Sequence, residues 1–203
     1  MHTEAPNSGK IGRPRGFDEE VTLEAAMRVF WAKSYEGATM SDLTEAMGIN
    51  RSSMYAAFGD KERLFRRAIE RYRNGPMTFI KEALALPTLR GTVVALLNGS
   101  VNFLGTPGNP RGCLSLQGAL ASGTDAEPVK DAMIEWRKQG EAAIKKRVQQ
   151  AQRDGDLDKA INPADFTNYL SMLMSGLSVQ AANGATKAEL RRYAEMSLRF
   201  MGY

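Results

Sequence analysis

From Asp18 to the last residue, apolar side chains recur at the spacing of α-helices, and short runs with Gly, Pro or Asn separate the segments. The alternating pattern of strands is nearly absent. The chain is therefore predicted to be all-α. Its 203 residues allow a small domain joined to a larger one, and 43% hydrophobic with 25% charged residues is the balance of an ordinary globular protein.

The first two predicted helices have recognisable starts and stops. Asp18 can cap a helix whose buried stripe continues until Gly37 ends it. Thr39 then opens a capping-box-like T-x-x-D sequence, which predicts a short helix over 40–47. Gly48 can end this helix by taking a left-handed conformation.

Further helices follow at similar signals. Asn50 can cap a short helix over 51–58, and Asp60 starts a longer helix that ends near residue 74. Asn162 before a proline and the T-x-x-E box at Thr186 start two more. Beyond Pro76 we predict helices near residues 77–86, 88–104, 113–122, 127–153, 163–183 and 187–201.

The two short helices around Gly48 have the layout of a helix-turn-helix, in which the second helix enters the DNA major groove. Asn50, Arg51, Ser52 and Ser53 place donors at the N-terminus of that second helix, where they can meet phosphates and base edges. From the layout alone, a helix pair that does not bind DNA is equally compatible.

A series of particular residues favours DNA binding over the alternative. It comprises Ala25, Ala26, Phe30, Gly37, Thr39, Gly48, Ile49, Tyr55, Phe58, Lys61, Glu62 and Leu64. With these residues, the stretch 12–72 closely resembles the N-terminal domain of the TetR (tetracycline-repressor-like) family over roughly sixty residues. The resemblance implies that Thr39, Tyr55 and Lys61 touch DNA phosphates and that Arg51, Ser52 and Ser53 face the groove. Ala56, Ala57 and Gly59 depart from the family pattern, which leaves the operator sequence unpredicted.

The Gly- and Pro-rich lead is basic and contains Arg13 and Arg15. Its GRPRG sequence resembles the core of an AT-hook, whose Arg-Pro-Arg lies in a narrow A·T minor groove. A solubilising tail is the alternative. We include both arginines among the expected DNA-binding residues.

For the C-terminal half, the resemblance implies a helical pocket for a small molecule and a dimer face made by the last two helices. The helix near 163–183 is apolar around much of its circumference, which favours a partner helix over burial inside its own domain. We expect a dimer interface of Phe166, Leu170, Leu173, Leu177, Leu190 and Tyr193. The expected ligand-binding residues, which plain core packing also explains, are Phe103, Leu104, Cys113, Leu116, Met133, Trp136 and Met172.

Cys113 is the chain's one cysteine and follows Arg111 at a predicted helix start. A helix dipole and a neighbouring cation can stabilise a thiolate. The Arg-Gly-Cys-Leu segment also looks like that of some TetR-family members which respond to electrophiles or oxidants. A sensor thiol and a small buried hydrophobe beside Leu114 and Leu116 both remain open.

Enzyme chemistry is poorly supported. The single histidine, His2, lies in the lead, and the sequence has no GxxxxGK, GxGxxG or HExxH pattern. We therefore predict no enzyme, no cofactor and no metal site. The sequence shows neither a signal peptide nor an apolar run of spanning length, which predicts a cytoplasmic protein.

Together these inferences predict a flexible basic arm over 1–17, a helix-turn-helix domain over 18–62 and a ligand-binding and dimerisation domain over 63–203. The expected fold is a three-helix DNA-binding domain plus a larger helical bundle, with about nine or ten helices. The expected function is a repressor that binds palindromic operator DNA as a homodimer and is released by a small-molecule or electrophile signal. A DNA-binding activator and a helical ligand-binding protein with no DNA role are the alternatives.

Overall fold

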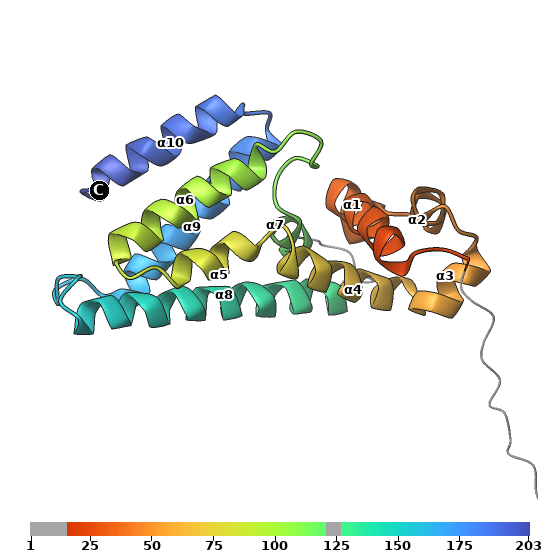
Figure 1. The fold of residues 1–203 in the computed structure, drawn as a ribbon, viewed down its shortest axis with the longest axis horizontal. Helices are drawn as coiled ribbons and strands as arrows, with labels where there is room; N and C mark the ends of the chain where they lie inside the picture. The colour runs from red at the N-terminus through yellow and green to blue at the C-terminus, as the bar shows by residue number, and fades with distance from the viewer. Residues whose placement is uncertain (1–15, 121–126) are drawn as a thin grey trace, which may run out of the picture.

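The computed structural model describes residues 16–120 and 127–203, and within these ranges it contains helices and no strand. The predicted all-α fold is confirmed. Figure 1 shows α1–α4 at one end of an elongated molecule and α5–α10 at the other, with the long α8 running beneath both. The helices are α1 (Glu19–Gly37), α2 (Met40–Met47), α3 (Arg51–Phe58), α4 (Lys61–Asn74), α5 (Thr78–Leu84), α6 (Leu89–Leu104), α7 (Leu114–Ala119), α8 (Glu127–Arg153), α9 (Pro163–Ala182) and α10 (Lys187–Phe200).

Local hydrogen bonds set the helix ends at the predicted residues. The Thr39 hydroxyl accepts from the Asp42 backbone N–H at 3.1 Å, and the Thr39 backbone N–H donates to the Asp42 carboxylate at 3.0 Å, which completes a capping box. Gly48 ends α2 with φ of 65°, the predicted left-handed conformation. A second capping box joins Thr186 and Glu189 at the start of α10.

α1 differs from the prediction, because its helical path is interrupted at Ser34, where φ is 60° and ψ is 178°. Ser34 is the one non-glycine residue of the described ranges with positive φ. The interruption places Tyr35 against two rings, at 6.2 Å from Phe30 and 5.2 Å from Phe65 between centroids. Aromatic packing thus holds a strained backbone position. Gly37, which was predicted to stop the helix, remains helical, and the chain leaves α1 at Ala38.

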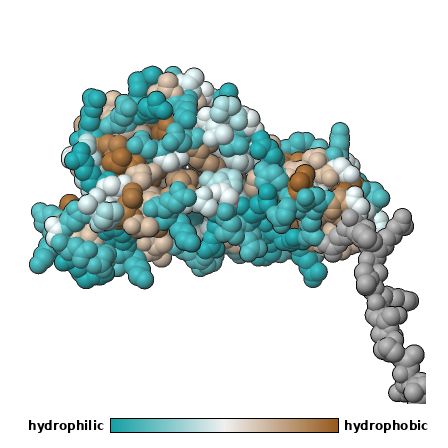
Figure 2. All heavy atoms as spheres, in the orientation of Figure 1, coloured by the Kyte–Doolittle hydropathy of each residue, from teal (hydrophilic) through white to brown (hydrophobic). Residues whose placement is uncertain are grey.

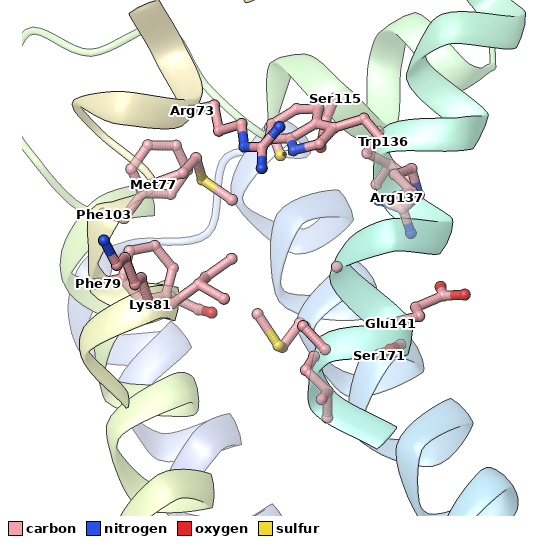
Figure 3. Close-up of a pocket in the computed structure, with 18 of the residues that line it drawn as sticks. Arg73, Met77, Phe79, Lys81, Phe103, Ser115, Trp136, Arg137, Glu141 and Ser171 are labelled. Atoms are coloured by element: carbon pink, nitrogen blue, oxygen red, sulfur yellow. Dashed lines mark hydrogen bonds between the residues drawn. The ribbon is translucent and has the colours of Figure 1, made fainter. Parts of the chain in front are cut away.

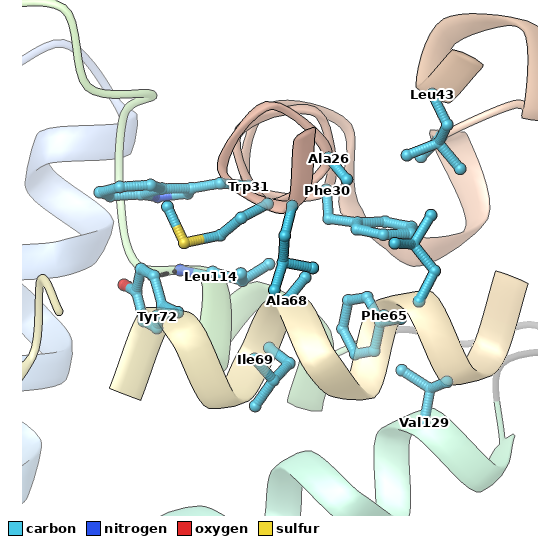
Figure 4. Close-up of a cluster of buried hydrophobic side chains, with 14 of the residues drawn as sticks. Ala26, Phe30, Trp31, Leu43, Phe65, Ala68, Ile69, Tyr72, Leu114 and Val129 are labelled. Carbon is cyan, nitrogen blue, oxygen red and sulfur yellow. Dashed lines mark hydrogen bonds between the residues drawn. The ribbon is translucent and has the colours of Figure 1, made fainter. Parts of the chain in front are cut away.

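One hydrophobic core lies between α1–α4 and extends to α7 and α8 (Figure 4). Phe30 and Phe65 meet edge to face at its centre, with their centroids 4.9 Å apart. Leu114 of α7 is fully buried and Val129 of α8 is 1% exposed in the same cluster. The α1–α4 end and the larger bundle therefore share a core, which fixes their relative positions.

The second core lies inside the larger bundle, where α6 packs against α9 and α10. Val93, Leu96 and Leu97 of α6 are fully buried there. On the face shown in Figure 2, hydrophilic residues cover most of the surface and apolar residues show in patches between the helices of this bundle. No helix in residues 16–120 or 127–203 has the length and apolar character needed to span a membrane.

Candidate functional site

The helix pair α2–α3 forms the first candidate site. Met54 and Phe58 of α3 are buried in the first core, at 0% and 4% exposure, and hold the helix against the domain. This leaves the opposite face of α3 outward, where Arg51, Ser52 and Tyr55 are exposed. Burial of one helix face thus presents polar side chains on the other, as a groove-reading helix requires.

Hydrogen bonds fix the start of α3 and join this helix to α2. Asn50 accepts from the Ser53 backbone N–H at 2.8 Å and so caps α3. Arg51 donates to the Ser41 hydroxyl at 3.1 Å, which joins α3 to α2. Thr39 is exposed at the start of α2 and keeps its hydroxyl proton for an external acceptor, because the capping bond uses only its oxygen. Sequence reasoning missed Ser41, whose position beside Arg51 depends on how the two helices pack.

Lys61 lies in the first turn of α4, with its ammonium 4.5 Å from the ring centroid of Tyr35. This cation–π contact orients the side chain. Partial burial lowers the pKa of Lys61, while the nearby Glu36 carboxylate acts in the opposite direction. Tyr35 carried no sequence signal, because it faces Lys61 only after the break at Ser34. Arg13 and Arg15 lie outside the described residues.

A cavity of about 650 Å³ in the larger bundle forms the second candidate site. Figure 3 shows it between α5 and α6 on one side and α8 and α9 on the other. Its volume is in the range of small-molecule pockets. Five expected ligand-binding residues line it, namely Phe103, Leu104, Cys113, Leu116 and Trp136.

Two expected ligand-binding residues lie elsewhere. Met133 is 3% exposed and belongs to the first core, and it does not line the cavity. Met172 is 61% exposed on α9, also away from the cavity lining. Both residues were chosen for apolar character alone. Apolar character does not show whether a side chain lies in the cavity wall, in the core or on the outer surface. The polar residues of the wall, among them Arg137, Ser171 and Ser175, were missed.

Contacts connect the two candidate sites. The Trp31 indole N–H of α1 donates to the Gly112 carbonyl at 2.9 Å, and the Trp31 ring stacks on Phe103 with centroids 5.2 Å apart. The Tyr72 hydroxyl of α4 donates to Cys113 Sγ at 3.3 Å and accepts from the Leu114 backbone N–H at 3.3 Å. Helices α1 and α4 therefore contact residues of the cavity wall directly.

Cys113 is 8% exposed and is the residue immediately before α7. Its sulfur lies 3.3 Å from the Tyr72 hydroxyl and 3.1 Å from the Ser115 hydroxyl. Burial raises the pKa of Tyr72 well above its ordinary value, so the phenol stays protonated as a donor to the sulfur. The thiol is thus mostly buried and also lines the cavity, which keeps both of its expected roles open.

The expected dimer-interface residues of α9 and α10 differ in how far they are exposed in the single chain. Leu170 and Leu190 are fully buried and Leu177 is 6% exposed, all in the core of their own bundle. These three side chains have almost no surface left for a partner. Phe166 and Leu173 pack partly against the same core.

Other apolar residues of the same two helices are exposed instead. The expected Tyr193 is among them, at 41%. The rest are Tyr169, Met172, Val179, Met196 and Phe200, with Phe200 at 83%. Exposed apolar side chains of this size on two helices that contact each other are a candidate interaction surface.

The described residues contain no group of three or more His, Cys, Asp or Glu side chains arranged to hold a metal ion.

Comparison with known proteins matches both halves of the chain. Residues 23–68 match the family described as bacterial regulatory proteins, tetR family, and residues 90–196 match the tetracyclin repressor-like C-terminal domain. Two similar proteins come from Escherichia coli (strain K12). The HTH-type transcriptional repressor ComR is 26% identical over 93% of this chain and 90% of its own length. The HTH-type transcriptional repressor BdcR is 28% identical over 92% and 90%.

A solved structure is similar over nearly the whole length. It is a cysteine mutant of the TetR family transcriptional regulator CifR, complexed with 26-bp double-strand operator DNA. The match has a TM-score of 0.87 and 36% sequence identity, and it covers 92% of this chain and 98% of that one.

Proposed function

This chain belongs to the TetR family of bacterial regulatory proteins, and on that premise we propose that it is a transcriptional repressor whose homodimer binds operator DNA and is released by an effector. The observation that carries the proposal is the match to a relative solved on its operator, which covers 92% of this chain. The repressors ComR and BdcR support the sign of regulation.

We assign the DNA contacts by chemistry and position. Thr39, Tyr55 and Lys61 bind phosphates, because hydroxyls and an ammonium are good phosphate donors and these side chains lie around the start of α2, on α3 and at the start of α4. Arg51 and Ser52 are exposed at the N-terminus of α3 and read base edges. Asn50 and Ser53 position this helix through their capping bond.

We propose that two parts of the chain carry the two functions, with the bounds that the sequence predicts. Residues 18–62 form the DNA-binding domain, and residues 63–203 form the effector-binding and dimerisation domain. The proposed dimer face is the exposed apolar surface of α9 and α10 that includes Met172, Met196 and Phe200. Pairing of this face between two copies gives a symmetric dimer, which requires a palindromic operator.

Selection of bound duplexes from a random pool tests the proposal. We expect a palindrome with half-sites about one helical turn apart, and affinity that falls with salt at a log–log slope of about −4 to −8. Recovery of no consensus and a slope near zero would favour a helical ligand-binding protein with no DNA role. In vitro transcription from the selected operator separates a repressor, which lowers transcript, from an activator, which raises it.

The effector acts on Cys113 covalently or binds in the cavity without a covalent bond. The position of Cys113 in the cavity wall, in contact with Tyr72 of α4, supports the covalent route. A Cys113→Ser variant decides between them. If the thiol is the sensor, N-ethylmaleimide alkylates Cys113 and releases the unmutated protein from its operator, whereas the Cys113→Ser variant stays bound. Release of both proteins, or resistance of the folded thiol to alkylation, assigns the signal to a non-covalent ligand.

A further inference from the structure

The charges of the cavity wall are unbalanced. Its lining includes three cationic residues, Arg73, Lys81 and Arg137, and a single carboxylate, Glu141. Arg137 and Glu141 are one turn apart on α8, yet no ion pair joins Arg137 to any carboxylate of the described ranges. In Figure 3 the Glu141 carboxylate points toward the outer side of α8, away from Arg73. The wall therefore carries net positive charge.

Arg137 is half-buried, and its guanidinium donates one hydrogen bond, to the Ser175 hydroxyl at 3.0 Å. A guanidinium carries five N–H donors, and a buried cation is normally paired. The remaining donors of Arg137 make no hydrogen bond to any described residue. An arginine in this state, beside an apolar cavity, matches the planar two-oxygen face of a carboxylate, sulfonate or phosphate group.

Hydroxyl groups extend the polar wall beside Arg137. Ser171, Ser175 and Ser178 of α9 recur at helical spacing and all line the cavity. The Ser171 oxygen is the one buried side-chain N or O atom of the described residues that has no hydrogen-bond partner. A hydroxyl rotates about a single bond, so Ser171 can donate to a bound acceptor without movement of the helix.

The cavity wall also has an apolar part. Phe79, Phe103 and Leu104 come from α5 and α6, and Trp136 comes from α8, next to Arg137 (Figure 3). A ligand that fills this cavity must therefore place an apolar, ring-sized body against the aromatic residues and an anionic group against Arg137.

We propose that the cavity binds an amphipathic anion, a small molecule with an apolar body and one carboxylate-, sulfonate- or phosphate-type group held by Arg137. Arg73, exposed at the edge of the cavity, adds attraction at longer range. The inference rests on the proposed function only in treating the cavity as the effector site. Binding to the free protein is measured without DNA, so failure of one claim does not decide the other.

Two dyes with the same aromatic skeleton test the charge requirement. 8-Anilinonaphthalene-1-sulfonate carries a sulfonate, and N-phenyl-1-naphthylamine is its neutral counterpart. Both are titrated, by dye fluorescence, into the full-length protein, into Arg137→Gln and into a matched control, Arg153→Gln. Arg153 lies on the same helix, is exposed and does not line the cavity.

We expect Arg137→Gln to weaken binding of the anionic dye at least about tenfold and to change binding of the neutral dye less than about twofold. Arg153→Gln should change neither. An equal loss for both dyes, no loss for either, or the same loss in Arg153→Gln overturns the proposal. Thermal unfolding checks that the variants fold. If Arg137→Gln does not fold, Arg73→Gln replaces it. We then expect a smaller loss of affinity, for the anionic dye alone. Equal effects of Arg73→Gln on the affinities of both dyes refute the charge requirement.

Displacement of the anionic dye defines the rest of the ligand. 2-Naphthoate and decanoate, which combine a carboxylate with an apolar body, should displace it at similar concentrations. Inorganic phosphate should not displace it at those concentrations, because it lacks the apolar body. Displacement by phosphate as readily as by 2-naphthoate contradicts the amphipathic requirement. Operator binding by the same protein preparations is measured separately, and its result tests only the proposed function.

Discussion

Replacement of Trp31 by phenylalanine perturbs the junction between the DNA-reading end and the cavity. The substitution removes the donor to the Gly112 carbonyl, a bond of 2.9 Å in a buried setting. An unpartnered buried carbonyl costs about 1–3 kcal/mol. The smaller ring also leaves space beside Phe103 and Tyr72, because Trp31 is 1% exposed, and we add about 1–2 kcal/mol for that lost packing. The free energy of unfolding should therefore fall by about 2–5 kcal/mol.

Trp136→Phe is the matched control, since the chain has two tryptophans. Trp136 is half-buried, its centroid lies 6.1 Å from that of Tyr72, and its indole N–H makes no hydrogen bond to a described residue. Its replacement should cost about 1 kcal/mol or less. Urea unfolding followed by circular dichroism, at one fixed protomer concentration because a dimer's stability depends on concentration, gives both values. A loss in Trp31→Phe no larger than that in Trp136→Phe would refute the role assigned to the Gly112 bond.

Three further predictions concern DNA contact, assembly and pH. Tyr55→Phe and Lys61→Gln should each weaken operator binding about threefold or more at every operator sequence, as measured by fluorescence anisotropy. Lys61→Gln should also make the log–log salt slope shallower by about 1–2, because it removes a charge. Unchanged affinity in both variants would remove the phosphate assignment. Phe200→Glu should shift the dimer toward folded monomers in sedimentation, because this 83% exposed side chain is proposed to be covered by a partner, and an unaltered dimer would place the interface elsewhere. Burial raises the pKa of Tyr72, so above about pH 10 the unfolded chain releases the phenolic proton while the folded chain keeps it, and stability falls as pH rises. Tyr72→Phe should lose less stability than the unmodified protein over that pH step, and equal losses would contradict the assignment.

The DNA-binding half was largely readable from the sequence. Asp18, Thr39, Asn50 and Asp60 all cap helices where predicted, because a cap depends on a side chain and the backbone two or three residues away. The resemblance of the stretch 12–72 to the TetR family then gave the function of the helix pair. Arg51 and Tyr55 proved exposed, as a DNA contact requires.

The C-terminal half was predicted correctly in its helices and less well in its surfaces. The helix near 163–183 does carry apolar side chains on more than one face, some of them buried in its own core and others exposed. Apolar spacing could not tell which face meets its own core, so Leu170 and Leu177 were assigned to a partner while the exposed Met172 was assigned to a pocket. Arg137 was missed because a lone arginine on a charged helix is usually solvated.

The sequence by itself determined the helices, their caps and the family, since each depends on residues close in the chain or on a characteristic series of them. Only the tertiary structure decided that Ser34 breaks α1, that Arg137 lines a cavity without an ion pair to any described carboxylate, and that Trp31 bonds to Gly112. These features depend on contacts between residues far apart in the chain. Helical periodicity fixes which residues share a face, and the packing of whole helices fixes what that face meets.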